Sequence, residues 1–187
     1  MEVYINRALN ISLEKPKNEM DKDSLEAMYR QYYKNVYNYI SFRINNHYDS
    51  EDLANTVFEN AIRKFHTYKP ECAPIEAWLI GIAKNVVTDH LRSKKHTVFT
   101  PIEDILGLAS PSDRPEEVVV RNEDNRALIQ AMSKLKDKER QILSMKFSTD
   151  LKNHEIAGIL GMSESNVGVI VHRSIKKLMK LLEKERV

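Results

Sequence analysis

Cysteine is almost absent from this 187-residue chain, and glycine and proline are scarce. The one cysteine, Cys72, excludes an intramolecular disulfide and any cysteine-rich zinc site. Five glycines and six prolines are about half the usual share, which favours long helices joined by few turns. Long apolar runs are missing too, so we expect no membrane insertion, and residues 1–20 have no apolar core of signal-peptide type. These absences indicate an α-rich cytoplasmic protein.

Charged residues make up 30% of the chain, but the two signs are unevenly distributed. Residues 84–95 and 173–187 are basic, whereas residues 97–117 between them are acidic. Two basic segments separated by an acidic one are typical of two contacts with a polyanion, although a solvated helix face explains any single basic run at least as well. The net charge of only +2 argues against tight DNA binding by the protein alone.

The acidic segment also holds the densest cluster of helix-breaking residues in the chain, including Pro101, Pro111 and Pro115. This composition predicts a flexible linker over residues 96–117. The linker separates an N-terminal unit (24–95), preceded by an unassigned extension (1–23), from a C-terminal unit (118–187). Both units are small for an independent core, so we expect a partner to complete their stability.

Apolar residues recur at helical spacing in three parts of the N-terminal unit. The first helix is expected over residues 25–43, the second from Asp49 or Ser50, and the third from Pro74, a favourable first-turn residue. No strand-like alternation is present. We therefore predict a helical bundle here and an all-α fold of two small helical domains for the whole chain.

The third helix has an informative polar face. Asn85, Asp89 and Arg92 share this face, and Lys84 and Thr88 flank it. A plain surface helix with an ordinary Asp89–Arg92 pair is one interpretation. The other is a nucleic-acid interface, in which cations hold phosphates while the amide and the carboxylate read base edges.

The C-terminal unit has the residue spacing of a helix-turn-helix. Ala157 is small where two helices cross, Gly161 allows the positive φ of a tight turn, and Val167 packs the second helix on the first. Ser163 is placed to cap the second helix, whose N-terminal residues would face the bases of a major groove. The expected DNA-facing residues and the basic tail behind them are Ser163, Glu164, Ser165, Asn166, Val169, His172, Arg173, Lys176 and Lys177. A helical module that binds protein instead of DNA remains the alternative.

Three stretches resemble the extracytoplasmic-function (group IV) sigma factors of bacterial RNA polymerase. They are DSEDLANTVF (49–58), WLIGIAKNVVTDHLR (78–92) and residues 135–182 with their helix-turn-helix. The resemblance covers residues 24–183 in the correct order and spacing. It implies that residues 24–95 are sigma region 2, that residues 118–187 are sigma region 4, and that the protein directs promoter-specific transcription initiation.

The resemblance also implies three sets of contacts. Core polymerase would bind the second helix, where Asp52 and Asn55 face the partner while Leu53 and Phe58 serve the bundle core; Thr56 completes the set. The promoter's −35 element would bind the helix-turn-helix. Its −10 element would bind the third helix and the loop before it, at Tyr68, Lys69, Lys84, Asn85, Thr88, Asp89 and Arg92. An anti-sigma factor is a further implied partner.

Two positions depart from the family pattern. Asn55 stands where the family often has Gln, which shortens the reach and keeps the chemistry. Gly168 stands where the recognition helix often has Lys or Arg; this removes a phosphate or base contact and costs ~1 kcal/mol of helix propensity.

If the two units fold back on each other in the free protein, we expect that packing to mask the DNA-binding faces.

Two other classes of function compete with this interpretation. A stand-alone helix-turn-helix regulator that binds duplex DNA without polymerase explains the C-terminal unit but gives residues 49–58 and 78–92 no role. An enzyme is disfavoured because the six histidines form no zinc motif and no glycine-rich phosphate loop or nucleophile elbow is present. We expect no catalytic residues, metal or cofactor. The promoter sequence, the genes controlled, the inducing signal and the role of residues 1–23 are not given by the sequence.

Overall fold

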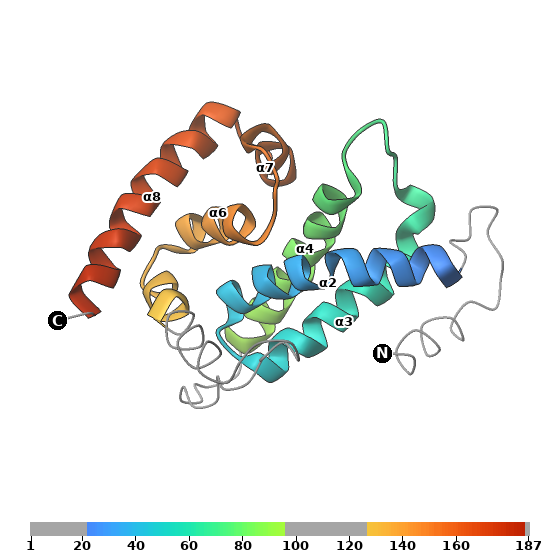
Figure 1. Ribbon diagram of the computed structural model, residues 1–187, viewed down its shortest axis with the longest axis horizontal. Helices are drawn as coiled ribbons and strands as arrows, with labels where there is room; N and C mark the ends of the chain where they lie inside the picture. Colours follow the sequence, from blue (N-terminus) through green and yellow to red (C-terminus); the bar gives the residue numbers. More distant parts are fainter. Residues whose placement is uncertain (1–21, 96–126, 186–187) are drawn as a thin grey trace, which may run out of the picture.

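A computed structural model of the protein describes residues 22–95 and 127–185 (Figure 1). Its elements are α2 (Lys22–Ile44), α3 (His47–Lys64), the 3-10 helix η1 (Phe65–Thr67), α4 (Ile75–Lys95), α6 (Asp137–Ser148), α7 (Asn153–Leu160) and α8 (Glu164–Glu185). Residues 127–133 are helical as well. No strand occurs in these two ranges, and the predicted all-α class is confirmed. The predicted linker (96–117) and residues 1–21 lie outside the described residues.

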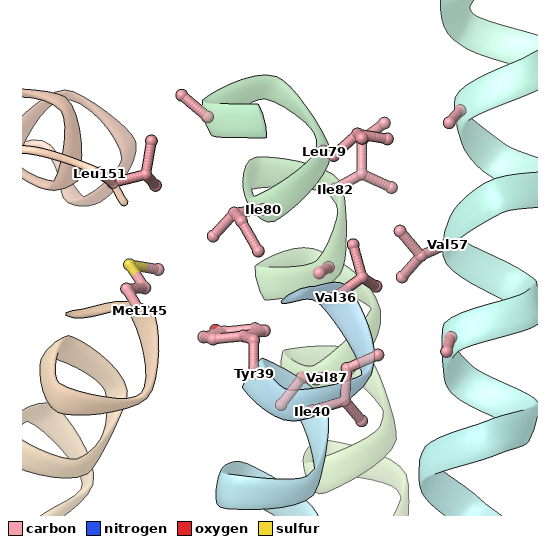
Figure 2. Close-up of a cluster of buried hydrophobic side chains, with 14 of the residues drawn as sticks. Val36, Tyr39, Ile40, Val57, Leu79, Ile80, Ile82, Val87, Met145 and Leu151 are labelled. Carbon is pink, nitrogen blue, oxygen red and sulfur yellow. The ribbon is translucent and has the colours of Figure 1, made fainter. Parts of the chain in front are cut away.

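The N-terminal bundle consists of α2, α3 and α4, each of which packs against the other two. Val36 and Ile40 of α2, Val57 of α3 and Leu79 of α4 are all but inaccessible to solvent. Figure 2 shows these side chains converging on the space between the three helices. Burying an aliphatic side chain of this size contributes ~1.5–3 kcal/mol, so the apolar stripes predicted from the sequence are what hold the bundle together.

Helix α3 begins two residues earlier than the sequence predicted. Asp49 and Ser50 were the expected start, but the N-cap is Asn46, whose side-chain Oδ1 accepts the backbone N–H of Asp49 at 3.0 Å. The preceding Asn45 has a φ of 56°, in the left-handed region that asparagine tolerates better than most residues. The pair Asn45–Asn46 therefore forms the whole turn between α2 and α3.

The C-terminal unit is built around two apolar clusters. One is small and lies between residues 127–135, α6 and α8; its buried members are Ala131, Met132, Leu135, Leu143 and Leu178. The other continues the core of the N-terminal bundle and includes Ile142, Met145, Leu151, Ile156 and Val167. Helix α6 contributes to both clusters and is therefore the central helix of this unit.

The two units pack directly against each other. Helix α2 lies along α6 and α4 contacts α7, whereas α8 lies on the outer side (Figure 1). In the close-up, Tyr39 and Ile80 of the bundle face Met145 and Leu151 of the C-terminal unit (Figure 2). Each unit thus covers apolar surface of the other, which is the role that the sequence analysis assigned to a partner.

Candidate nucleic-acid and polymerase interfaces

Three polar residues of α4 form an exposed face, as predicted. Asn85, Asp89 and Arg92 are all exposed, and the side chains of Asp89 and Arg92 are each 77% accessible. Their closest approach is 3.8 Å between Asp89 Oδ1 and Arg92 Nη1. Such an exposed ion pair contributes little to stability. Breaking it therefore costs little, and each of the two side chains can bind a ligand in place of the other.

Lys84 and Thr88, which flank this face, are engaged within the protein. Lys84 Nζ donates a hydrogen bond to the backbone carbonyl oxygen of Ile159 in α7, at 3.2 Å. Thr88 Oγ1 donates to the carbonyl oxygen of Lys84 at 2.7 Å, one turn back along α4. The ammonium group of Lys84 therefore lies at the C-terminal end of α7, where unpaired carbonyl groups and the helix dipole favour a cation.

An aromatic cluster lies at the base of the loop between α3 and α4. The ring centroid of Tyr68 is 5.3 Å from that of Trp78 and 5.9 Å from that of Phe65. Burial raises the pKa of the Tyr68 hydroxyl, so this group stays protonated and can donate a hydrogen bond. The neighbouring Lys69 is exposed. Trp78 is half-buried against the bundle core, and its ring joins that of Tyr68 in a surface on which bases can stack.

The helix-turn-helix has the predicted geometry. Gly161 ends α7 with a φ of 62° and a ψ of 44°, a conformation that costs glycine nothing. Ser163 precedes α8, and its Oγ accepts the backbone N–H of Asn166 at 3.3 Å. Val167 is fully buried and Ala157 is 5% exposed where α7 and α8 cross. Each residue thus has the structural role that its chemistry indicated.

The first turns of α8 present their polar side chains to solvent. The exposed residues are Ser163, Glu164, Ser165, Asn166, Val169, His172 and Arg173. Gly168 lies on a different side of the helix, because a Cβ built on it would meet Asn153 Nδ2 of α7 at 3.6 Å. The side chain of a larger residue would therefore start against α7 before reaching outward.

The two lysines of the basic tail differ in their surroundings. Lys176 is exposed, whereas Lys177 Nζ donates to Glu139 Oε2 of α6 at 2.9 Å. This hydrogen bond, more than any other influence, lowers the pKa of the Glu139 carboxyl. Lys176 is thus available to a phosphate, while Lys177 would first have to release Glu139.

The five residues of α3 that were predicted to bind polymerase differ in their exposure to solvent. Phe58 is 3% exposed and belongs to the bundle core, and Leu53 is half-buried against it. Asp52 is exposed, and its carbonyl oxygen accepts a hydrogen bond from Thr56 Oγ1. Asn55 Oδ1 accepts the hydroxyl of Tyr29 at 3.3 Å. Asp52, Asn55 and Thr56 therefore remain at the surface of the helix.

The docking of the two units does not mask these faces, so that expectation was wrong. Asn85, Asp89, Arg92 and the exposed residues of α8 stay accessible although the units are in contact. Among the residues predicted to bind the −10 element, Lys84 is the one that the described contacts tie to the other unit. The units meet where α2 packs on α6 and α4 contacts α7, and the side chains of Asn85, Asp89 and Arg92 stay exposed outside these contacts.

Comparison with known families matches both units. Residues 28–97 match the family model of sigma-70 region 2, and residues 125–178 match that of sigma-70 region 4. The RNA polymerase sigma factor YlaC of Bacillus subtilis is 32% identical over 166 residues, which are 88% of this chain and 95% of YlaC. The chain belongs to the sigma-70 family of RNA polymerase sigma factors.

This sigma factor is also similar to a second characterised sigma factor and to a solved structure. The ECF RNA polymerase sigma factor BldN of Streptomyces coelicolor is 28% identical over 162 residues, which are 87% of this chain and 61% of BldN. The solved sigma factor RpoE of Bartonella quintana, in complex with the anti-sigma factor NepR, has the same fold with a TM-score of 0.69 at 17% identity, over 84% of this chain and 96% of that one. The extracytoplasmic-function group that the motifs indicated is confirmed.

Family membership also decides between the competing functions. A sigma factor gives core RNA polymerase its promoter specificity and leaves catalysis to the polymerase, so the prediction of a non-enzymatic initiation factor is confirmed. Within the described ranges of this sigma factor, no three His, Cys, Asp or Glu side chains gather as metal ligands. No helix in those ranges is both long and apolar enough to cross a bilayer.

Two contacts of this sigma factor had no signal in its sequence. Arg43 Nη1 of α2 lies 2.8 Å from Asp137 Oδ1 of α6, and Lys84 bonds a backbone carbonyl group of α7. The first pair is separated by 94 residues and the second by 75, so no local spacing relates the partners. Both contacts join the two units.

Proposed function

We propose that this sigma factor works in the cytoplasm by binding core polymerase through α3, the −10 element through α4 and the loop before it, and the −35 element through the start of α8. One observation carries the assignment: the side chains expected to read bases in each unit are exposed on helix faces that no other described element covers. Asn85 and Asp89 would read bases of the −10 element. Ser163, Glu164 and Asn166 would read the −35 element in a major groove.

The loop before α4 supports single-strand recognition. Extracting a base from a duplex costs a few kcal/mol, which stacking on an aromatic surface and phosphate contacts can offset. Tyr68 and Trp78 provide such a surface, and the exposed Lys69 lies next to it in the chain. We therefore assign promoter opening to this end of the bundle.

The experiment that tests the function combines the protein with sigma-free bacterial core polymerase and fragmented genomic DNA, and sequences the 5′ ends of the transcripts. Discrete start sites that share two upstream elements are expected. Their sequences also define the promoter needed for every later assay. Protein-dependent binding of duplex DNA without such transcripts would instead support a stand-alone regulator.

Substitutions then test the −10 face. Asn85→Ala should weaken binding to a promoter fragment that contains the −10 element by about 5- to 150-fold, because removing a base-reading amide costs ~1–3 kcal/mol. Affinity for core polymerase should not change. Gln31→Ala removes an exposed amide from α2 and is the matched control. Loss of polymerase binding in Asn85→Ala, with binding retained in Gln31→Ala, would show that the α4 face is structural.

The −35 tail is tested by salt dependence. Lys176→Gln should reduce affinity for all promoter sequences alike and lower the slope of log affinity against log salt by ~1, because one phosphate fewer is neutralised. Lys138→Gln removes an exposed lysine from α6, a helix that carries none of the residues predicted to bind DNA, and is the control. An unchanged slope for Lys176→Gln would exclude this residue from the interface.

The polymerase face is tested by charge reversal. Asp52→Arg, on the exposed side of α3, should weaken the complex with core polymerase, while Asp23→Arg at the exposed start of α2 should not.

An inhibitor of anti-sigma type is a further proposed partner, supported by the similarity to RpoE, which was solved with NepR. Such an inhibitor should co-purify with the tagged protein from its own cells and suppress transcription in the start-site assay.

A further inference from the structure

One aliphatic side chain near the start of α8 points away from the protein. Val169 is 46% exposed, whereas the other β-branched residues in the described part of α8 are buried or half-buried. Its neighbours on the same side of the helix, one turn before and one turn after it, are the exposed Ser165, Asn166, His172 and Arg173. An apolar side chain thus lies at the centre of the polar face that we assign to the −35 element.

The folded protein itself gains little from Val169. The residue belongs to neither of the two apolar clusters that the described residues form. Valine also has a lower helix propensity than alanine, so it is a mildly unfavourable choice at an exposed helical position. Single exposed aliphatic residues are common on protein surfaces, and what distinguishes Val169 is its place among side chains that face a base.

The base edges in a major groove differ in what they offer to an aliphatic side chain. Guanine, cytosine and adenine present hydrogen-bonding groups there, whereas thymine presents a C5-methyl group beside its carbonyl oxygen. Valine methyl groups placed over a hydrogen-bonding group would exclude water from it and supply no hydrogen bond in return. Placed over the thymine methyl group, they bury apolar surface on both molecules. A valine on a base-reading face therefore favours thymine over the other three bases.

The exposed Asn166 indicates where in the element this thymine lies. A side-chain amide is suited to a bidentate pair of hydrogen bonds with adenine. Val169 follows Asn166 by three residues, which is a rise of ~4.5 Å along the helix, and successive base pairs are ~3.4 Å apart along the duplex. The two side chains therefore reach the same base pair or adjacent ones.

We propose that Val169 determines specificity within the −35 element by packing its methyl groups against the C5-methyl group of one thymine, no more than one base pair from the adenine that Asn166 binds. The inference rests on the proposed assignment of the start of α8 to the −35 element. It adds the identity of the base that this position selects and the chemical group by which it is selected. The −35 element that the start-site assay defines should contain this thymine.

The test removes methyl groups from the DNA and from the protein separately. Synthetic promoter duplexes carry deoxyuridine in place of each −35 thymine in turn, and these two bases differ by the C5-methyl group alone. Their affinities are measured for the full chain assembled with core polymerase. Val169→Ala removes both γ-methyl groups and should keep the helix, because alanine has the higher helix propensity. Met179→Ala is the matched control, since it removes another exposed apolar side chain of α8, ~15 Å farther along the helix.

Deoxyuridine at one thymine should weaken binding by the parent about 4-fold, the effect of losing the burial of one methyl-sized group. The same change in the DNA should alter binding by Val169→Ala less than about 2-fold, because two changes that remove one contact are not additive. Met179→Ala should be as sensitive to deoxyuridine as the parent. Equal sensitivity of the parent and Val169→Ala, or sensitivity of the parent at no thymine, would overturn the proposal.

The same measurements distinguish this proposal from the proposed function. If the parent assembled with core polymerase binds no promoter fragment selectively, both fail. Selective binding to a −35 element that lacks thymine, or whose thymine methyl groups are dispensable, would leave the proposed function in place and reject the role of Val169. Weaker binding of Val169→Ala to core polymerase in the absence of DNA would assign the residue to a protein interface and would also reject it.

Discussion

The two units differ in how they bury their apolar side chains. The N-terminal bundle encloses its core among three long helices, and most members of the main cluster come from it. The C-terminal unit has a five-residue cluster of its own, and the other buried side chains of α6 and α7 belong to the core of the bundle. The C-terminal unit should therefore depend on the bundle for its stability more than the bundle depends on the C-terminal unit.

The largest effect should follow from Leu79→Ala in α4. Leu79 is fully buried in the shared cluster, so the cavity should lower the free energy of unfolding by about 2–5 kcal/mol. Urea unfolding measures the loss, and hydrogen exchange should show reduced protection in α6 as well as in α4. Protection of α6 that stays at the parent level would mean that the units are stabilised independently.

A smaller and more local effect is expected from Leu178→Ala in α8. This residue is 4% exposed and belongs to the five-residue cluster, so the loss should be about 2 kcal/mol, the lower end of the range for a leucine truncation. Hydrogen exchange should accelerate in α8 and residues 127–133 but not in α3. Faster exchange in α3 would contradict the proposed direction of dependence.

Two of the three glycines in the helix-turn-helix, Gly168 and Gly161, should respond to alanine substitution with opposite signs. Gly168→Ala meets Asn153 Nδ2 at an ordinary contact distance and should raise the free energy of unfolding by about 0.5–1 kcal/mol through helix propensity. Gly161→Ala places a Cβ at a φ of 62° and should lower it by ~1 kcal/mol. Thermal unfolding of both variants checks the pair. A destabilised Gly168→Ala would mean that α7 and α8 cannot accommodate a methyl group.

The smallest expected effect is on the pH dependence of stability, and it arises from a histidine within the bundle. Burial, with a further contribution from Lys94, lowers the pKa of His90, while Asp49 acts in the opposite direction. Since the folded pKa is below that of the unfolded chain, the neutral form is favoured on folding. This contribution is complete above pH ~6.5 and is lost as the pH falls from there toward the folded pKa.

His90→Gln should therefore flatten the loss of stability between pH 7.5 and pH ~5.5, measured as the urea midpoint. His154→Gln, at an exposed position of α7, is the control. Identical pH profiles for the parent and His90→Gln would show that this histidine does not couple protonation to folding.

The sequence predicted those features that depend on residues close together in the chain. Periodic apolar residues located the helices of the bundle, and Gly161 and Ser163 are where their backbone and capping chemistry placed them. The start of α3 was missed because Asn46 competes with Asp49 and Ser50, and all three are good capping residues.

The contacts between the units could not be predicted in the same way. A buried Arg43 next to an exposed Asp137 has no periodic signature, and the acceptor for Lys84 is a backbone group that any residue would supply. Local patterns thus predicted which residues bind DNA. They could not show that one of them, Lys84, is held by the opposite unit.

The buried position of Arg43 also determines how the contact between the two units responds to ionic strength. Counterions screen exposed phosphate contacts strongly, whereas a guanidinium that is 2% accessible and the apolar surface beside it are screened little. Added salt should therefore release the protein from DNA without separating its units.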